Sequence, residues 1–225
     1  MVWGMEPGLR GTLQLDFDGT LAHGDVSTGI LARFADPAWT ERVEAASRRL
    51  LADPDRPDLI DTMVAGFAEL TGGREDHLSY AHEHHPVRPG LADLIETAER
   101  LGLDCHVVSN GFEFYIRDYL ARASVEQRVA VHCGSVSESG SLVYAGPDGR
   151  PVRRRFKVAW AEHFLGHSQC LVYVGDGSSD IAAARLAGTV FARDALLSGL
   201  EEGFAGRVRP FETLHDVARG LEELA

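Results

Sequence analysis

Short apolar runs of strand length alternate with longer stretches of helical period along this chain of 225 residues. The short runs are rich in Val and Leu, and most of them end at a glycine or a polar residue, which is typical of buried strands. Predicted strands end at Leu15 and cover 104–109, 129–133, 171–175 and 189–192; predicted helices cover 91–101 and 112–123, the segment that carries Lys157, and an alanine-rich segment ending at Gly188. This alternation predicts an α/β fold with a Rossmann-like, mainly parallel sheet flanked by helices.

From just after Thr20 to about residue 86, the apolar residues recur at the spacing of a helix. Two apolar stripes recur at helical spacing, and they consist of Trp39, Val43, Ala46 and Leu50, and of Leu59, Ile60, Met63, Val64, Phe67 and Leu70. The two prolines within residues 53–57 must separate these helices. We therefore expect a small helical cap at 23–86, inserted after the first strand into a core made of residues 1–22 and 87–225. A hairpin is expected around residues 139–140 and 148–149.

Polar side chains follow three of the predicted strands. They are Asp16 and Asp18, then Ser109 and Asn110, then Asp176 and Asp180. An acidic strand end followed by glycine is also common turn chemistry, so the Asp-x-Asp-Gly-Thr segment alone is only moderately specific. In sheets of this class, however, ligands bind beyond the carboxyl ends of the strands. These segments are therefore expected to meet at one site.

Lys157 is the single lysine of the chain, and all its other basic side chains are arginines. A lysine left by chance on a helix face is the simple alternative. Against that alternative, a lysine ammonium is a compact point charge suited to phosphate, for which arginine is no equivalent. Lys157 is therefore a candidate phosphate-binding residue.

The formal net charge of −12 argues against nucleic acid or an anionic membrane as a partner, because both require a basic face. The one basic run, Arg153 to Arg155, is either a solvated approach to Lys157 or a means of steering an anionic substrate. The chain has no apolar run of 18 residues, and its start lacks a basic segment followed by an apolar one. We expect a cytoplasmic monomer or homodimer whose partner is a small molecule.

Cysteine and histidine give weaker signals. Cys105, Cys133 and Cys170 are odd in number and lack Cys-x-x-Cys spacing, so a disulfide framework or a zinc site is not expected, and two of them fit strand-like core positions. The histidine-rich segment 82–86 does not fit one helical face and ends at Pro86. It is interpreted as an exposed hinge, with a metal role left open.

Together, the strand-end motifs and Lys157 resemble the signature of the haloacid dehalogenase (HAD) superfamily of phosphoryl-transfer enzymes over nearly the whole chain. Within it, the chain is most similar to the phosphoserine-phosphatase-like branch, and above all to the methionine-salvage enol-phosphate (2-hydroxy-3-keto-5-methylthiopentenyl-1-phosphate) phosphatases. The segments that carry this closer resemblance are 108–116, 175–180, 190–194 and 211–217. Two positions depart from it. Phe156 stands where the enol-phosphate group often has Cys, and Asp25 stands where phosphoserine phosphatases have a glutamate that holds the substrate amine.

The resemblance implies a phosphoric monoester hydrolase that acts on a small phosphorylated metabolite. Asp16 would attack phosphorus to form an aspartyl-phosphate, and Asp18 would protonate the leaving alkoxide before activating water. Ser109 and the backbone amide of Asn110 would hydrogen-bond the phosphoryl group, while Lys157 balances its charge. Because a halide leaving group needs no proton, Asp18 favours phosphate esters over carbon–halogen bonds.

The resemblance also implies Mg²⁺ as the cofactor, since the carboxylates and the phosphate would otherwise repel one another. The expected ligands are Asp16, Asp176 and the backbone carbonyl of Asp18, with Asp180 contributing directly or through water. Asp180 by itself is equally well explained as an acid at a helix start.

Substrate contacts in the cap are the least determined part of the prediction. Asp25 is a candidate contact for a polar or cationic substrate group, or the N-cap of the first cap helix. Arg56 is a candidate contact for a substrate carboxylate. Two other functions stay open: a phosphotransferase to a small alcohol acceptor, and a non-catalytic binding or partner subunit that kept the fold.

Overall fold

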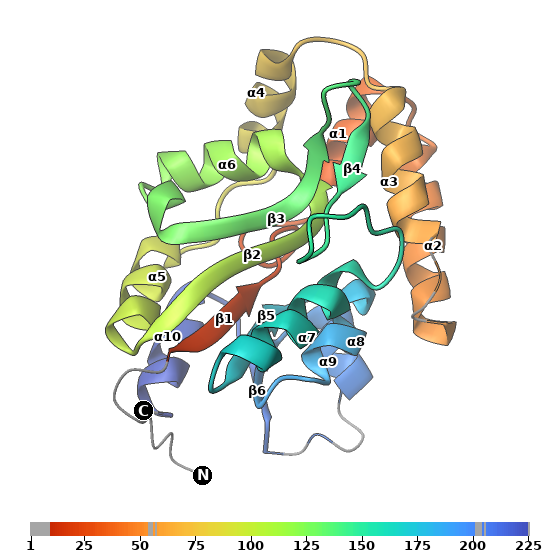
Figure 1. The fold of residues 1–225 in the computed structure, drawn as a ribbon. Coiled ribbons are helices and arrows are strands. Elements are labelled where there is room, and N and C mark those ends of the chain that lie inside the picture. The colour runs from red at the N-terminus through yellow and green to blue at the C-terminus, as the bar shows by residue number, and fades with distance from the viewer. Residues whose placement is uncertain (1–9, 54–55, 57, 201–203, 205, 225) are drawn as a thin grey trace.

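The computed structural model describes residues 10–53, 56, 58–200, 204 and 206–224. Its centre is a seven-stranded sheet with the strand order β4-β3-β2-β1-β5-β6-β7 (Figure 1). Neighbouring strands are parallel, apart from the antiparallel pair β3 and β4. The strands are β1 (Gly11–Leu15), β2 (Leu103–Phe112), β3 (Val129–Val136), β4 (Leu142–Tyr144), β5 (Leu171–Gly175), β6 (Thr189–Ala192) and β7 (Val208–Pro210). The predicted α/β class with a mainly parallel sheet is confirmed.

Strand β1 lies in the middle of this sheet, and all five of its residues are buried. Leu13 pairs with Cys105 of β2 on one side and with Val172 of β5 on the other. The chain therefore leaves β1 in one direction to build β2, β3 and β4, and later returns beside β1 to build β5, β6 and β7. Ligand crevices form where the strand order of an α/β sheet changes direction in this way.

Helices cover both faces of the sheet. Figure 1 shows α5 (Leu91–Arg100) and α10 (Leu214–Glu222) together on one side, and α7 (Phe156–His167), α8 (Ile181–Ala184) and α9 (Asp194–Leu200) on the other. Helix α6 (Glu113–Arg122) packs on β2 and β3, and two 3₁₀ turns, η1 (Glu126–Arg128) and η2 (Ser178–Asp180), complete the core. Within the described ranges, none of the helices has the length and apolar character that crossing a membrane requires.

Four helices follow β1 and form a helical insertion along the top and right of Figure 1. They are α1 (Val26–Phe34), α2 (Trp39–Ala52), α3 (Asp58–Ala68) and α4 (Arg74–His84). The first predicted stripe lies on α2, where Trp39, Val43 and Ala46 are buried, and the second lies on α3, which ends before Leu70. Of the predicted break, residues 54, 55 and 57 lie outside the described part. An isolated antiparallel bridge between Ala22 and Val87 joins the two ends of the insertion.

Several element boundaries differ from the prediction. β2 continues to Phe112 instead of ending at Ser109, because the register shifts between Val108 and Phe112 and pairing with β3 resumes at Gly134. The helix predicted to end at Gly188 ends at Ala184. Strand β7 was not predicted, since it has three residues and ends in proline, a poor signal for a strand.

The predicted hairpin is present. β3 and β4 are joined by a turn in which Ser137 donates its backbone N–H to Ser141 O, and a second turn closes with a bridge between Ala145 and Pro151. The core positions expected of two cysteines are also observed, since Cys105 and Cys133 are buried on β2 and β3 and carry free thiols.

The histidine segment is exposed only in part: Glu83, His84 and Pro86 are exposed as expected, whereas His82 is half-buried, and the hinge role stays a prediction. Residues up to His84 continue α4, because Pro86 lies beyond the helix end and does not remove one of its hydrogen bonds. His82 packs against α6, with its Nε2 2.6 Å from Asp118 Oδ2 and its ring stacked on Tyr119. The segment therefore fixes the helical insertion to the core.

Candidate active site

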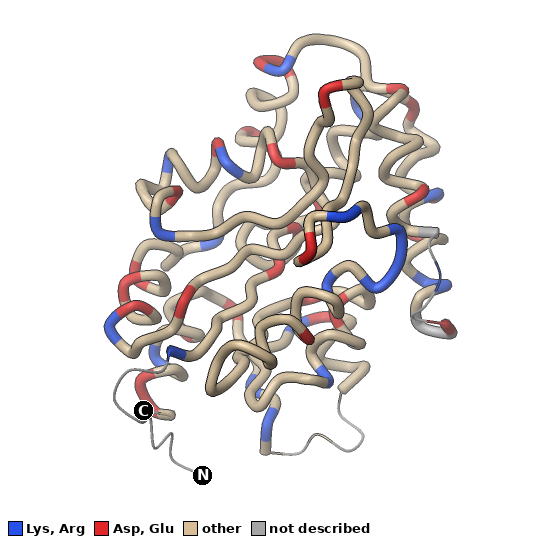
Figure 2. The backbone as a smooth tube through the Cα atoms, in the orientation of Figure 1, with Lys and Arg blue, Asp and Glu red and all other residues tan. Residues whose placement is uncertain are grey.

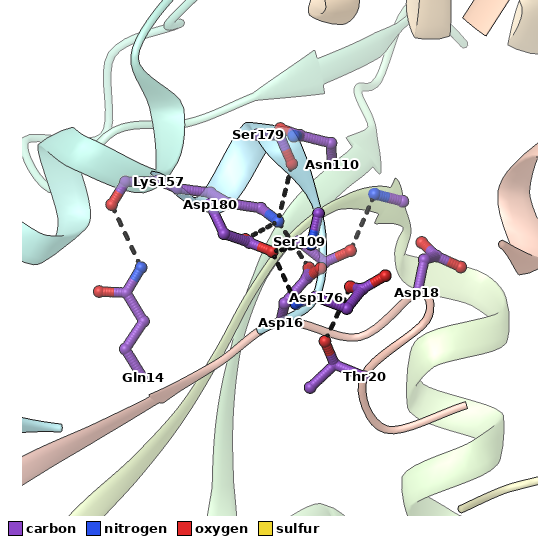
Figure 3. Close-up of polar contacts among 12 residues, drawn as sticks. Gln14, Asp16, Asp18, Thr20, Ser109, Asn110, Lys157, Asp176, Ser179 and Asp180 are labelled. Carbon is purple, nitrogen blue, oxygen red and sulfur yellow. Dashed lines mark hydrogen bonds and ion pairs between the residues drawn. The ribbon is translucent and has the colours of Figure 1, made fainter. Parts of the chain in front are cut away.

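Segments that are distant in the sequence meet beyond the carboxyl ends of the neighbouring strands β2, β1 and β5 (Figure 3). Asp16 follows β1, Ser109 lies on β2, Asp176 follows β5, and Lys157 comes from the first turn of α7. These side chains line a single cleft of about 400 Å³. The expected convergence of the strand-end motifs is therefore observed.

Lys157 lies between two carboxylates. Its Nζ is 2.7 Å from Asp16 Oδ1 and 2.6 Å from Asp180 Oδ1, and only 3% of the lysine side chain is exposed. Burial alone would lower the pKa of this ammonium, but Asp16 and Asp180 together raise it above its ordinary value. Lys157 is therefore held as a cation at the floor of the cleft.

Asp16, Asp176 and Asp180 each place a carboxylate oxygen within 4.8 Å of the others. Burial, and then the neighbouring carboxylate charges, raise the pKa of Asp16 and of Asp176 well above the usual range, although Lys157 opposes this shift. Closely packed carboxylates with one lysine form a donor set that a hard divalent cation fits, because such ions prefer oxygen ligands. These residues are candidate metal ligands.

Asp180 is fully buried and already satisfied by the protein. Its Oδ2 accepts hydrogen bonds from the backbone N–H groups of Asp176 and Gly177, and its Oδ1 accepts from Tyr173 and Lys157. Asp180 therefore shapes the loop after β5 and orients Lys157. This arrangement explains the residue better than a helix-start acid alone would.

The turn after β1 contacts the Asp176 carboxylate and fixes its position. Thr20 donates its hydroxyl hydrogen to Asp176 Oδ1 at 3.0 Å. Gly19 has a φ of +76°, and a Cβ there would lie 2.1 Å from Asp176 Oδ2. The Gly-Thr pair of the motif is thus required both by the left-handed backbone and by the close approach of the carboxylate.

Asp18 points away from Asp16 in Figure 3. Its Oδ1 accepts hydrogen bonds from the backbone N–H groups of Val26 and Ser27 at the start of α1, and its Oδ2 accepts from the Tyr115 hydroxyl at 2.7 Å. Burial raises the pKa of Asp18 well above its ordinary value, the charge of Asp25 adds to this, and the Tyr115 hydrogen bond opposes it. The raised pKa favours the protonated form of Asp18 more than in an exposed aspartate.

Ser109 and Asn110 border the cleft on the β2 side. The Ser109 hydroxyl oxygen accepts a hydrogen bond from Gly111 N at 3.0 Å, which orients the side chain. Tyr144 donates its hydroxyl hydrogen to the Asn110 carbonyl and so holds the same turn from β4.

Of the two readings of Asp25, the structure contains the helix cap. Its Oδ1 accepts hydrogen bonds from Thr28 N at 2.8 Å and Ser27 Oγ at 2.7 Å at the start of α1. The residue also lines the cleft, so a substrate contact by the same side chain stays a prediction.

Arg56 lies outside the cleft that contains Asp16. It lines an adjacent hollow of about 250 Å³ between the helical insertion and the start of α7, together with Arg153, Arg154 and Arg155. Figure 2 shows the arginine run as blue positions in the connection that leads into α7. Arg153 forms an ion pair with Asp61, and Arg155 one with Glu162. All three arginines of the run are exposed on the approach to Lys157, and their steering of an anionic substrate stays a prediction.

The rest of the cleft is lined by residues that the sequence prediction did not assign. Val43, Leu59 and Met63 of the helical insertion form an apolar part of its wall, and Arg193 lies at the end of β6. Arg193 directly follows a predicted strand, so the strand-end rule contained a signal for it. Tyr115 had no such signal, because nothing in a helical segment marks a tyrosine as a partner of a distant aspartate.

Comparison with known proteins identifies relatives of this chain. The family described as haloacid dehalogenase-like hydrolase matches residues 14–185. A 2-hydroxy-3-keto-5-methylthiopentenyl-1-phosphate phosphatase of Exiguobacterium sibiricum is 26% identical over 92% of this chain and 94% of that protein. The enzyme of the same name from Brevibacillus brevis is 25% identical over 93% of this chain and 94% of its own length.

Solved structures agree on the fold. A phosphoserine phosphatase, solved as an analogue of the phospho-aspartyl intermediate, has a TM-score of 0.65 and 17% identity, and the match covers 94% of this chain and 99% of that one. At 17% identity this similarity shows the fold alone.

Proposed function

Because the chain belongs to the haloacid dehalogenase-like hydrolases and is a phosphoric monoester hydrolase, we propose that it hydrolyses a small phosphate ester through an aspartyl-phosphate, with Mg²⁺ as cofactor. The observation that carries this proposal is the placement of Lys157 between Asp16 and Asp180, beside Asp176, at the floor of one cleft. This arrangement provides a nucleophile and charge neutralisation in one place, as phosphoryl transfer requires.

Asp16 is the proposed nucleophile. Lys157 contacts its Oδ1, which leaves Oδ2 to attack phosphorus while the ester P–O bond breaks. Ser109 and the backbone amide of Asn110 are proposed to hydrogen-bond the phosphoryl oxygens, and Lys157 to offset their charge. The phosphate oxygens are thereby stabilised most strongly as charge develops on them.

Asp18 is the proposed general acid and base. Protonated at the start, it donates its proton to the alkoxide that leaves from phosphorus. The resulting carboxylate then takes a proton from water as that water attacks the aspartyl-phosphate, which releases phosphate and regenerates Asp16 and the protonated Asp18. The raised pKa of Asp18 supports this role, because the acid has to be protonated when the first step begins.

Asp16, Asp176 and the backbone carbonyl of Asp18 are the proposed ligands of Mg²⁺, with Asp180 acting through the loop that it holds. The ion supplies charge neutralisation for the carboxylates and the phosphate. We further propose that residues 23–86 act as a cap over the core formed by 1–22 and 87–225, since α2 and α3 line the cleft. Location in the cytoplasm and a monomeric or homodimeric state stay predictions.

The test is phosphate release from a panel of small phosphate esters, with and without Mg²⁺. The panel includes the enol phosphate named for the relatives, phosphoserine and p-nitrophenyl phosphate. We expect Mg²⁺-dependent release by the native chain, loss of at least a thousandfold in kcat for D16N, roughly what removal of a covalent nucleophile costs, and no loss for D148N, which changes an exposed turn. No release from any ester by the native protein would refute the proposal.

A further inference from the structure

Arg88 lies where the chain returns from the helical insertion to the core. It directly follows the bridge between Ala22 and Val87, and its own backbone N–H donates to Leu21 O at 2.8 Å. The residue is only 3% exposed, which is rare for an arginine, and it borders the cleft that contains the carboxylates. A guanidinium is tolerated at such a buried position only where its donors find acceptors.

All three nitrogens of the Arg88 guanidinium donate to backbone carbonyls. Nε donates to Thr20 O at 2.9 Å, Nη2 to Gly19 O at 2.8 Å and Nη1 to Glu212 O at 2.9 Å. A planar guanidinium suits this arrangement because its donors point in fixed directions, whereas a lysine ammonium is a compact point charge. The side chain therefore joins the turn after β1 to the segment that precedes α10.

Two of these carbonyls belong to the turn that carries the Gly-Thr pair of the first motif. Gly19 has a left-handed φ of +76°, and no backbone N–H of the described residues donates to the carbonyl oxygen of Gly19 or of Thr20. A buried carbonyl left without a donor is costly, so Arg88 supplies what the backbone of this turn does not. Its guanidinium thereby fixes the peptide groups on both sides of Thr20.

Thr20 connects this turn to the proposed metal ligands. Its hydroxyl donates to Asp176 Oδ1 at 3.0 Å, and Asp176 lies in the carboxylate cluster with Asp16 (Figure 3). Because Thr20 is fully buried, the position of its hydroxyl depends on the backbone that Arg88 fixes. Partners that orient a metal-binding side chain in this way commonly contribute about tenfold to a hundredfold to metal affinity.

We infer that Arg88 is a positioning residue for the cation site. Its guanidinium holds the peptide groups around Thr20, so that the Thr20 hydroxyl keeps Asp176 in place to bind Mg²⁺. Arg88 acts through the turn and not on the ion, because its own charge repels a cation. This inference rests on the proposed function and adds to it a residue that lies outside the strand-end motifs.

The test measures Mg²⁺ binding without substrate, by titration calorimetry and by the rise of Tm with Mg²⁺. R88K keeps the positive charge but cannot hold three carbonyls in three directions. We expect its Kd for Mg²⁺ to rise about tenfold or more. The matched control is R128K, since Arg128 is also hydrogen-bonded, to Glu99, but does not line the cleft. R128K should bind Mg²⁺ with the native Kd.

T20V breaks the same connection and leaves Arg88 in place. Valine keeps the shape of threonine and lacks only the hydroxyl that contacts Asp176, so this variant should fold. We expect T20V to raise the Kd for Mg²⁺ about tenfold or more, and this measurement decides the inference even if R88K does not fold. Because both changes act through one hydroxyl, the Kd of the double variant R88K/T20V should lie within about twofold of the Kd of T20V.

Three outcomes would overturn the inference. A native Kd in R88K together with a lowered Tm would make Arg88 a residue that stabilises the fold alone. A native Kd in T20V would show that the turn does not support cation binding through Asp176. Effects that multiply in the double variant would mean that Arg88 does not act through Thr20. Failure of the proposed function is distinguishable, because a native protein that binds Mg²⁺ but releases phosphate from no ester would refute the hydrolysis and leave the comparison of Kd values intact.

Discussion

Tyr115 shows how a single buried side chain can control the proposed acid. Its hydroxyl donates to Asp18 Oδ2, and two backbone N–H groups of α1 hold the other carboxylate oxygen. With Y115F the carboxyl group loses one of the contacts that fix its orientation. We expect kcat for an alkyl phosphate to fall roughly threefold to tenfold, about the effect of one hydrogen bond to a neutral acid, with a smaller loss for p-nitrophenyl phosphate, whose leaving group needs no proton.

The control for this variant is Y119F on the same helix. Tyr119 is also fully buried, and its hydroxyl donates to the carbonyl of His85, away from Asp18. Y119F should leave the ratio of kcat for the alkyl phosphate to kcat for p-nitrophenyl phosphate as in the native protein. If Y115F slowed both substrates equally, Tyr115 would support the fold and not the acid.

At the scale of elements, the start of α1 depends on Asp25. Its carboxylate caps the helix by accepting from Thr28 N, while Asp18 accepts from the two preceding N–H groups. D25A removes the cap and should reduce the free energy of unfolding by about 1 kcal/mol, which lowers Tm by about 2–4 °C in a chain of this size. D25S should recover most of the loss, because serine is an equally good cap. Equal losses in thermal unfolding of both variants would contradict a capping role.

The sequence predicts elements best where a long pattern has one interpretation. The stripe on α2 repeats over several turns, so the helix could be recognised without its neighbours. The end of β2 could not be predicted in this way, because the sequence of Ser109, Asn110 and Gly111 is typical of a turn. The strand continues past them only because Phe112 pairs with Gly134 in a shifted register. The histidines of α4 form no apolar stripe, and tertiary contacts such as that of His82 with Asp118 decide their packing.

For the whole molecule, the parallel sheet made most of the site predictable. Residues at the carboxyl ends of β1, β2 and β5 must lie at one edge of the sheet, so the sequence alone predicts that Asp16, Ser109 and Asp176 lie close together. Arg56 could not be placed, because it lies in a connection between helices whose position depends on packing. It lines the neighbouring hollow instead.

The carboxylate cluster also sets how the stability of the whole molecule depends on pH and metal. The folded-state pKa values of Asp16 and Asp176 lie above their unfolded values. Between a pH of about 4 and these raised pKa values, the native state therefore holds more protons than the unfolded chain. The contribution of Asp16 and Asp176 to the free energy of unfolding falls as the pH rises through this range. Mg²⁺ that binds the ionised carboxylates should reverse this loss, by about 2.7 kcal/mol at a hundredfold excess over Kd.

Replacing one of these carboxylates separates the destabilisation by their mutual repulsion from the stabilisation by bound Mg²⁺. At neutral pH and without metal, we expect D176N to be more stable than the native protein, because it removes one of three mutually repelling acids, of which Asp16 and Asp180 are buried and Asp176 is half-buried. The same variant should lose most of the Mg²⁺-induced rise in Tm and most of the phosphatase activity, whereas D148N should keep the native response to the ion. If Mg²⁺ raised the Tm of D176N as much as that of the native protein, the ion would bind elsewhere. If D176N lost this rise and had a higher Tm without metal, the native chain would give up stability to keep a cation site in its cleft.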